Sequence, residues 1–201
     1  MKVIGIMGKA GSGKTTLASE ITSKVMRIGC GYGASLRKKP VQIDSFAAPL
    51  KDFIKKLCDF TDDQLYGTEK DVVDPRYGVT PRYVMQQFGT DFVRKVLGED
   101  FWIMKMQERM AVAKRRGVRL FIIDDVRLQN EAVFIKQEGT LIHVIRENST
   151  VELGAIESKH ESELPPDAPW AMVFNNEGPI EKLADKFFDQ RMAIVKMRNG
   201  Q

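Results

Sequence analysis

The sequence of 201 residues predicts a doubly wound α/β domain, in which helices flank a parallel β-sheet. Five short apolar runs alternate with helical patterns, as expected where helices connect parallel strands. A glycine-rich phosphate-binding pattern follows the first run, and two acidic residues end the third. The length suits one well-cored domain and no internal repeat is present, so we expect residues 1–201 to form a single domain that binds ligands at the carboxyl ends of its strands.

The first apolar run leads into a phosphate-binding loop. Residues 3–7 suit a strand buried on both faces. The octapeptide that follows fits the pattern G-x-x-x-x-G-K-[ST], with the sequence Gly8-Lys9-Ala10-Gly11-Ser12-Gly13-Lys14-Thr15. Its glycines let several N–H groups point at one anion, and the next helix adds its positive end. A glycine-rich turn that fits by chance is the alternative, but the flanking strand and helix favour a nucleoside triphosphate site.

The loop pattern also assigns roles to its residues. Lys14 can reach the β- and γ-phosphates, and the Thr15 hydroxyl can ligate Mg²⁺. The residues expected to bind the nucleotide here are Gly8, Gly11, Ser12, Gly13, Lys14, Thr15 and Thr16.

The bulk composition is that of a soluble globular protein, with 29% charged and 43% hydrophobic residues. No apolar run approaches a membrane span, and the N-terminal run enters the phosphate loop, so we expect neither a membrane segment nor a signal peptide. Cys30 and Cys58 lack metal-like spacing, which favours two reduced thiols in the cytoplasm. The net charge of +4 fits a polyanion ligand or two phosphorylated substrates equally well.

Residues 15–75 contain two predicted helices and one strand. A helix over residues 15–28 is followed by a glycine-rich and then basic loop over residues 30–40. Residues 41–43 predict a strand, and Pro49 suits the first turn of a helix. That helix is expected to place four apolar side chains on one face, namely Leu50, Phe53, Ile54 and Leu57. Residues 59–75 are acidic without a clear period, which predicts an irregular segment: either a mobile cover over the substrate or a plain loop.

Thr80 and Pro81 predict a helix start, as the N-cap and the first helical residue. The helix carries two stripes that repeat every four residues and face opposite ways. The apolar stripe, expected to pack on the core, is Val84, Phe88, Phe92 and Val96. The polar stripe is Arg82, Gln86, Thr90 and Arg94. A solvated face is its alternative, but two arginines with an amide and a hydroxyl favour phosphate or base recognition. Gly89 lies mid-helix, which indicates close approach to the backbone.

The third predicted strand is buried on both faces and ends in acids. After an expected helix over residues 101–116, whose cationic end suits the helix dipole, residues 119–125 form a strand that finishes with Asp124 and Asp125. A carboxylate at this position holds the Mg²⁺ water shell or positions the nucleophile in nucleotide-binding folds. A capping pair is the alternative. The candidate metal-site residues are therefore Thr15, Asp124 and Asp125.

The C-terminal third predicts two further strands around an interruption. Residues 140–145 form a strand in which His143 is expected to pack in the core, with Arg146 at its end. Residues 147–169 are polar and rich in proline, and we expect a lid there. A short strand over residues 171–174 then leads through a turn to a final helix.

Five blocks of the sequence together resemble bacteriophage deoxynucleoside monophosphate kinases. These blocks are Arg82-x-x-x-Gln86-x-x-Gly89-Thr90-Asp91-x-x-Arg94, Phe101-Trp102, Asp125-x-Arg127-x-x-Asn130-Glu131, Arg146 and Asn176-x-Gly178. The resemblance spans nearly the whole chain in the same order. It implies a P-loop kinase fold with strand order 2-3-1-4-5 and the reaction ATP + dNMP → ADP + dNDP with Mg²⁺. It also suggests a homodimer.

The resemblance and the motifs together define the expected site. The expected catalytic residues are Lys14, Arg82, Asp91, Arg94, Asp125, Arg127, Glu131 and Arg146. The expected acceptor-binding residues, most of them within about residues 44–105, are Asp44, Phe46, Arg82, Gln86, Thr90, Asp91, Arg94, Trp102, Arg127, Asn130 and Glu131. The residues expected near adenine are Asn175, Asn176 and Gly178.

Other functions remain as alternatives. A dephospho-CoA kinase or nucleoside kinase shares the phosphate loop and differs in its acceptor pocket. An ATPase that acts on nucleic acid is a rival of another class, whereas a GTPase switch is disfavoured because no N-K-x-D motif is present. The sequence therefore favours small-molecule partners, ATP and a dNMP, over nucleic acid or a membrane.

Overall fold

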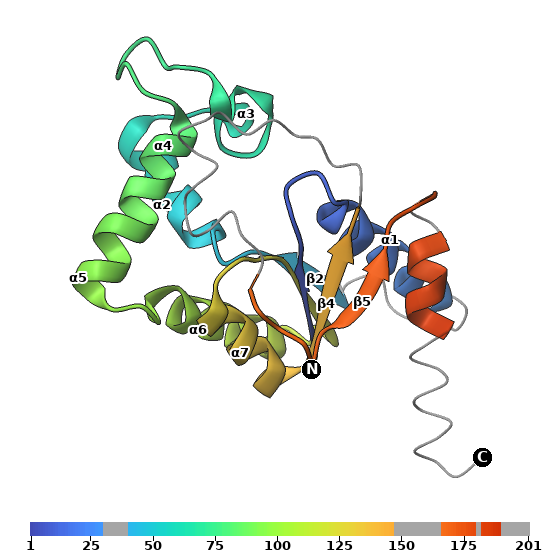
Figure 1. Ribbon diagram of the computed structural model, residues 1–201. Helices are drawn as coiled ribbons and strands as arrows, with labels where there is room; N and C mark the ends of the chain where they lie inside the picture. The colour runs from blue at the N-terminus through green and yellow to red at the C-terminus, as the bar shows by residue number, and fades with distance from the viewer. Residues whose placement is uncertain (30–39, 147–165, 180–181, 190–201) are drawn as a thin grey trace. The chain divides into compact units, whose positions relative to one another are not determined.

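A computed structural model describes residues 1–29, 40–146, 166–179 and 182–189 (Figure 1). The chain divides into two compact units. We call residues Met1–Asp44 with Val112–Gln201 the sheet unit, and residues Ser45–Ala111 the helical unit. Each is described by itself. Most of the basic loop predicted over residues 30–40 and of the lid predicted over residues 147–169 lies on residues 30–39 and 147–165, which are outside the described residues, as is Cys30.

The sheet unit contains one parallel sheet of five strands. The strands are β1 (Lys2–Met7), β2 (Val41–Asp44), β3 (Leu120–Val126), β4 (Thr140–Ile145) and β5 (Met172–Asn175). Their spatial order is β2-β3-β1-β4-β5, and every pairing is parallel. The predicted fold class and strand order are therefore confirmed. The order reverses beside β1, which is where ligands bind in open α/β sheets.

Helices cover the sheet. On one face, α1 (Lys14–Gly29) and the helix over residues 182–189 share a single core with the strands, in which Leu17, Phe174 and Phe187 are buried. On the other face lies α7 (Gln129–Glu138). A Cβ atom on Gly5 would lie 2.8 Å from the Ile135 side chain, so α7 packs directly on the backbone of β1 at this point.

The helical unit builds its own small core. Its elements are α2 (Ala48–Cys58), α3 (Asp62–Tyr66), the 3₁₀ helix η1 (Thr68–Asp71), α4 (Pro81–Gln86), the π-helix η2 (Gln87–Arg94), α5 (Lys95–Leu97) and the start of α6 (Phe101–Arg115). The core residues are Leu50, Ile54, Phe60 and Leu65, with Val84, Met85, Phe88 and Trp102 packed against them. The predicted start of α4 is confirmed, because the Thr80 hydroxyl accepts a hydrogen bond of 3.1 Å from the Tyr83 N–H.

The prediction of an irregular segment over residues 59–75 is wrong. This stretch contains α3 and η1, and α3 begins with a capping box in which Thr61 and Gln64 satisfy each other's backbone N–H groups. Asp74 then accepts hydrogen bonds from Arg76 and from Gln64. Helices this short have too few turns to show a hydrophobic period in the sequence. The capping residues Thr61 and Gln64 were the sequence signal that could have predicted α3.

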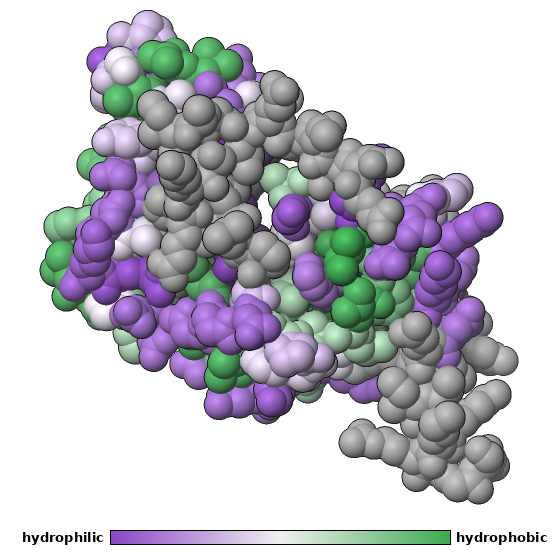
Figure 2. Space-filling model, viewed as in Figure 1, coloured by the Kyte–Doolittle hydropathy of each residue, from purple (hydrophilic) through white to green (hydrophobic). Residues whose placement is uncertain are grey.

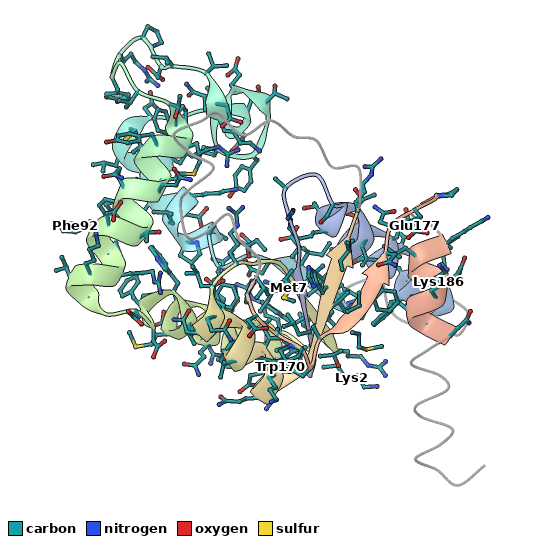
Figure 3. All side chains as sticks on the ribbon, viewed as in Figure 1. Lys2, Met7, Phe92, Trp170, Glu177 and Lys186 are labelled. Carbon is teal, nitrogen blue, oxygen red and sulfur yellow. The ribbon has the colours of Figure 1, made fainter. Side chains whose placement is uncertain are left out.

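Two predicted core faces are partly wrong. In α2, Leu50 and Ile54 are buried, whereas Phe53 and Leu57 are exposed. In the apolar stripe of residues 84–96, the first two members pack on the unit's core, but Phe92 and Val96 are 52% and 62% exposed (Figure 3). The reason is the π-helix, which turns more slowly than the α-helix that the stripe assumed.

None of the described helices has the length and apolar character that crossing a membrane requires. Cys58 carries a free thiol, as predicted.

Candidate active site

The phosphate loop joins β1 to α1. Three of its glycines have positive φ angles, 145° at Gly8, 73° at Gly11 and 100° at Gly13, which other residues rarely adopt. A Cβ atom on Gly8 would also overlap the carbonyl oxygen of Val144 on β4. The loop therefore requires glycine at these places, and its backbone curls at the N-terminus of α1, where anions bind.

Two side chains of the loop are arranged for an anion. The Lys14 ammonium group donates hydrogen bonds of 2.7 Å to the carbonyl oxygens of Gly8 and Lys9, which holds it over the loop. The Ser12 hydroxyl is buried, and within the described part of the chain it has no hydrogen-bond partner. A buried hydroxyl without a partner is costly, and a phosphate oxygen in the loop would supply one.

Asn176 connects the loop to the far edge of the sheet. Its side-chain amide donates a hydrogen bond of 2.8 Å to the Ser12 carbonyl oxygen, and its backbone N–H donates one of 2.7 Å to the carbonyl oxygen of Ile145. Asn175 and Gly178 are exposed on either side. Figure 3 shows that Glu177, the next residue, lies at the end of the sheet opposite to Lys2. The sequence did not predict a structural link from Asn176 to the phosphate loop.

The two acids of β3 lie at an irregularity in the sheet. Gly5 pairs with Ile123 and Met7 pairs with Val126, so β3 has one extra residue at Asp124 and Asp125. A bulge of this kind re-aims side chains and is common beside active sites. Asp125 is buried and Asp124 is half-buried, so the two carboxylates lie in different surroundings although they are adjacent.

Glu131 lies behind the turn that carries Arg127. It is only 4% exposed, and one carboxylate oxygen accepts hydrogen bonds from the N–H groups of Arg127 (2.8 Å) and Leu128 (3.0 Å). Burial, and secondarily the charge of Asp125, raise the pKa of Glu131 to about 8, although the two N–H groups oppose the shift. Asn130 accepts a hydrogen bond from the Glu131 N–H, and the Arg127 side chain is exposed.

The prediction that His143 packs in the core is wrong. Its side chain is half-buried on β4, opposite Met7, the residue that precedes the phosphate loop. Burial and then the positive charge of Lys14 lower its pKa below the usual value. His143 therefore lies in the electrostatic field of the loop lysine, and the signal that could have revealed this was the register between β4 and β1.

Several predicted site residues from both sides of the expected reaction lie at the carboxyl ends of the strands. The loop follows β1, Asp44 is the buried last residue of β2 and accepts a hydrogen bond of 3.2 Å from Gln42, and the exposed Arg146 follows β4. The described residues include no cluster of three or more His, Cys, Asp or Glu side chains that could hold a metal. Magnesium commonly uses one or two carboxylates together with substrate phosphates, and Thr15, Asp124 and Asp125 supply oxygen donors of that kind.

The predicted acceptor-side residues lie on the helical unit, apart from Asp44, Arg127, Asn130 and Glu131. Arg82 forms an ion pair with Asp71, including a hydrogen bond of 3.2 Å, and Arg94 donates a long one of 3.5 Å to the Glu99 carbonyl oxygen. Asp91 accepts hydrogen bonds from Gln87 and Lys95. The other members of this group are Phe46, which is buried, and Gln86 and Thr90, which are half-buried.

The remaining predicted acceptor-side residue on this unit is Trp102. Its indole N–H donates a hydrogen bond of 3.0 Å to the Gly89 carbonyl oxygen. The close approach predicted at Gly89 is confirmed, because a Cβ atom there would lie 2.7 Å from the Leu50 side chain.

A parallel sheet of order 2-3-1-4-5 with this loop after its first strand defines the class of P-loop nucleotide-binding proteins. Residues 37–187 match the sequence profile of the deoxynucleotide monophosphate kinase family. The chain is also 36% identical over 178 residues to a putative deoxynucleotide monophosphate kinase of Acanthamoeba polyphaga mimivirus, covering 79% of this chain and 85% of the relative. The chain belongs to the deoxynucleotide monophosphate kinase family and is a nucleotide kinase.

Solved structures resemble the chain as well. The protein TT1252 of Thermus thermophilus superposes with a TM-score of 0.52 at 18% identity and covers 96% of this chain and 97% of its own. An unliganded sugar kinase of Janibacter sp. gives a TM-score of 0.47 at 13% identity and covers 94% and 93%. At 18% identity, the likeness to TT1252 shows the fold alone.

Proposed function

We propose that this kinase uses ATP and Mg²⁺ to phosphorylate the 5′-phosphate of a deoxynucleoside monophosphate, giving dNDP and ADP. The observation that carries the proposal is the phosphate loop, in which Lys14 lies over the loop carbonyl groups and the buried Ser12 hydroxyl lacks a partner among the described residues. Both features fit a polyphosphate. The family membership supports the choice of acceptor.

On the donor side, the loop N–H groups and Lys14 would bind the β- and γ-phosphates of ATP. Thr15, Asp124 and Asp125 fit Mg²⁺ by their oxygen donors, and when bound the ion would neutralise charge that develops on the phosphates. Asn176 would hold the loop in shape through the Ser12 carbonyl. Asn175, Asn176 and Gly178 are proposed to lie near adenine, as the family resemblance suggests.

On the acceptor side, the attacking group is a phosphate oxygen that is already anionic, so little general-base help is needed. The difficulty is the repulsion between two anionic substrates. We assign its relief to Lys14 and to four arginines, which are Arg82, Arg94, Arg127 and Arg146. Gln86, Thr90, Asp91 and Trp102 would contact the deoxynucleoside, together with Asp44, Phe46 and Asn130. Glu131 would position Arg127, because its carboxylate accepts a hydrogen bond from the Arg127 backbone N–H.

An acceptor panel tests this proposal against its rivals. The protein is incubated with Mg·ATP and, separately, with each of the four dNMPs, the four NMPs, dephospho-CoA, a nucleoside or DNA, and ADP release is followed. ADP release that depends on at least one dNMP is expected. Turnover only with dephospho-CoA or a nucleoside, or ATPase activity that rises with DNA, would replace the proposal by one of its rivals.

Partners and location follow from the same proposal. We propose that the kinase acts on small molecules without nucleic acid or a membrane and works in the cytoplasm, that of a host cell if the chain is encoded by a bacteriophage. A homodimer is proposed from the family resemblance alone, and sedimentation velocity tests it.

A further inference from the structure

The acceptor-side helix changes its winding in the middle. It begins as α4 over Pro81–Gln86, continues as the π-helix η2 over Gln87–Arg94 and ends as α5 over Lys95–Leu97. Eight residues is long for a π-helix, because most are single-turn bulges and many of those occur at functional sites. The polar stripe described above crosses from the α part into the π part.

The change of winding straightens that stripe. In an α-helix, residues four apart are rotated by about 40° from each other, so four members of the stripe would spread over about 120°. A π-helix has about 4.4 residues per turn, so the same step rotates by about 30° in the opposite sense. The two senses partly cancel, and the spread over Arg82, Gln86, Thr90 and Arg94 falls to about 65°.

Burial along the helix confirms a period of four. The row that faces inward consists of Pro81, Met85, Gly89 and Val93, of which three are buried and Met85 is half-buried. The four residues of the polar stripe are each one position further along, and all four are half-buried. The polar stripe is therefore a continuous row along the edge of the buried row, which a regular α-helix would not give.

One side chain is bonded to the backbone in the middle of the π-helix. The Trp102 indole N–H donates its hydrogen bond of 3.0 Å to the carbonyl oxygen of Gly89, and the Leu50 side chain packs where Gly89 lacks a Cβ atom. Trp102 itself is fixed by the unit's core and by an edge-to-face contact with Phe101, with ring centroids 4.9 Å apart. The indole thus links the start of α6 to the carbonyl group at the centre of the row.

We propose that Trp102 is a positioning residue for the acceptor: its N–H group holds the π-helix in register, and the π-helix in turn aligns the row from Arg82 to Arg94 for one deoxynucleoside monophosphate. This inference rests on the proposed function, because it assigns a purpose to the acceptor side of that reaction. It assigns Trp102 an action through the backbone of Gly89, in addition to any contact with the base or sugar. The alternative is that the indole only fills space in the core.

The test removes the N–H group and keeps the ring. In a Trp170→Phe background Trp102 is the single tryptophan, so biosynthetic replacement of tryptophan by benzothienylalanine changes only its N–H to sulfur. Trp170→Phe alone is the matched control, because Trp170 is partly exposed on the sheet unit, where Lys136 lies over its ring. Trp102→Phe is a second variant. The readouts are KM for the best dNMP, KM for ATP, and amide hydrogen exchange of residues 86–94.

Loss of the N–H group should raise KM for the dNMP about three- to tenfold and leave KM for ATP within about twofold. Exchange of the amides in residues 86–94 should become about tenfold faster. Unchanged KM for the dNMP, or equal changes in both KM values, would overturn the inference, whatever the exchange rates do. Turnover of the unmodified protein with dNMPs is measured in the same series, so a failure of the proposed function shows there, separately from these ratios.

Discussion

The side-chain amide of Asn176 donates a hydrogen bond of 2.8 Å to the carbonyl oxygen of Ser12, across 164 residues of chain. The backbone N–H of Asn176 donates a hydrogen bond to the Ile145 carbonyl oxygen on β4, which fixes the position from which the side-chain amide reaches Ser12. The phosphate loop is consequently supported from the β5 side of the sheet. Loops that bind phosphate by their backbone N–H groups depend on such support, because a shift of about 1 Å misplaces every donor together.

Asn176→Ala should therefore raise KM for ATP about three- to tenfold, since one neutral hydrogen bond contributes about 1 kcal/mol. KM for the dNMP should remain within about twofold. Initial-rate kinetics with each substrate varied in turn measure both values. Glu177→Ala is the matched control, because the Glu177 side chain is exposed at the neighbouring position. Equal KM values for ATP in both variants would show that ATP binding by the loop does not depend on the hydrogen bond from Asn176 to Ser12.

The assignment of the arginines predicts large effects on turnover. Arg94→Ala and Arg127→Ala should each lower kcat by about 10²- to 10³-fold, because each removes a cation from the charge that develops during transfer. Arg115→Ala, at the exposed end of α6, should leave kcat unchanged. The measurement is ADP release at saturating substrates. Near-normal turnover of both Arg94→Ala and Arg127→Ala would mean that the site is assigned to the wrong residues.

The raised pKa of Glu131 predicts how the free energy of unfolding depends on pH. Its pKa is raised from an ordinary value of 4.5 to about 8, so between these values the folded protein holds a proton that the unfolded chain has released. Glu131 therefore makes the folded state less stable as the pH rises from about 5 to 8, by up to about 1.4 kcal/mol per pH unit. Below pH 4.5 this contribution to the pH dependence vanishes, because both states are protonated.

Glu131→Gln should remove that slope, because the amide oxygen still accepts the N–H groups of Arg127 and Leu128 but cannot ionise. Urea unfolding at pH 5.5 and pH 8 measures the free energy of unfolding at each pH. Glu138→Gln, which alters an exposed residue at the end of the same helix, serves as the control. If wild type and Glu131→Gln lose equal stability between the two pH values, then Glu131 is ionised in the fold at neutral pH.

His143 offers a probe of the loop lysine. Burial and Lys14 both lower the pKa of His143, so the imidazole should titrate below 6.5 in the free protein. Lys14→Ala should raise this pKa part of the way back, because burial remains. The chain has two histidines, so NMR titration of the imidazole signals resolves His143, with His160 observed in the same sample. A pKa of His143 that is the same with and without the Lys14 side chain would place the lysine away from β4.

The sheet was predictable from the sequence because each of its strands is a short apolar run with a clear end. The glycine pattern around Lys14 likewise identified the phosphate loop, since the positive φ angles at Gly8, Gly11 and Gly13 leave little other choice of residue. These features depend on local chemistry, which a single sequence records directly.

The remaining features depend on pairs of residues that are distant in the sequence. The bond from Asn176 to Ser12 and the approach of His143 to Lys14 arise only when β4 and β5 are placed beside β1. Phe92 is exposed because of the π-helix. The spacing of apolar residues does not reveal this winding, because Gly89 in the π-helix is fixed by contacts with Leu50 and Trp102, which lie elsewhere in the sequence. Figure 2 shows hydrophobic surface along the edge where η2 and α5 run.

The central claim is that Lys14 and the phosphate loop transfer the γ-phosphoryl group of ATP to a dNMP. It is tested most directly by incubating the protein and its Lys14→Ala variant with Mg²⁺, a dNMP and ATP labelled with ³²P at the γ-position. Labelled dNDP should form in step with ADP, and Lys14→Ala should form about 10²- to 10³-fold less while calorimetry still detects dNMP binding. Release of the label as inorganic phosphate without labelled dNDP, or equal dNDP formation by the variant, would contradict the claim.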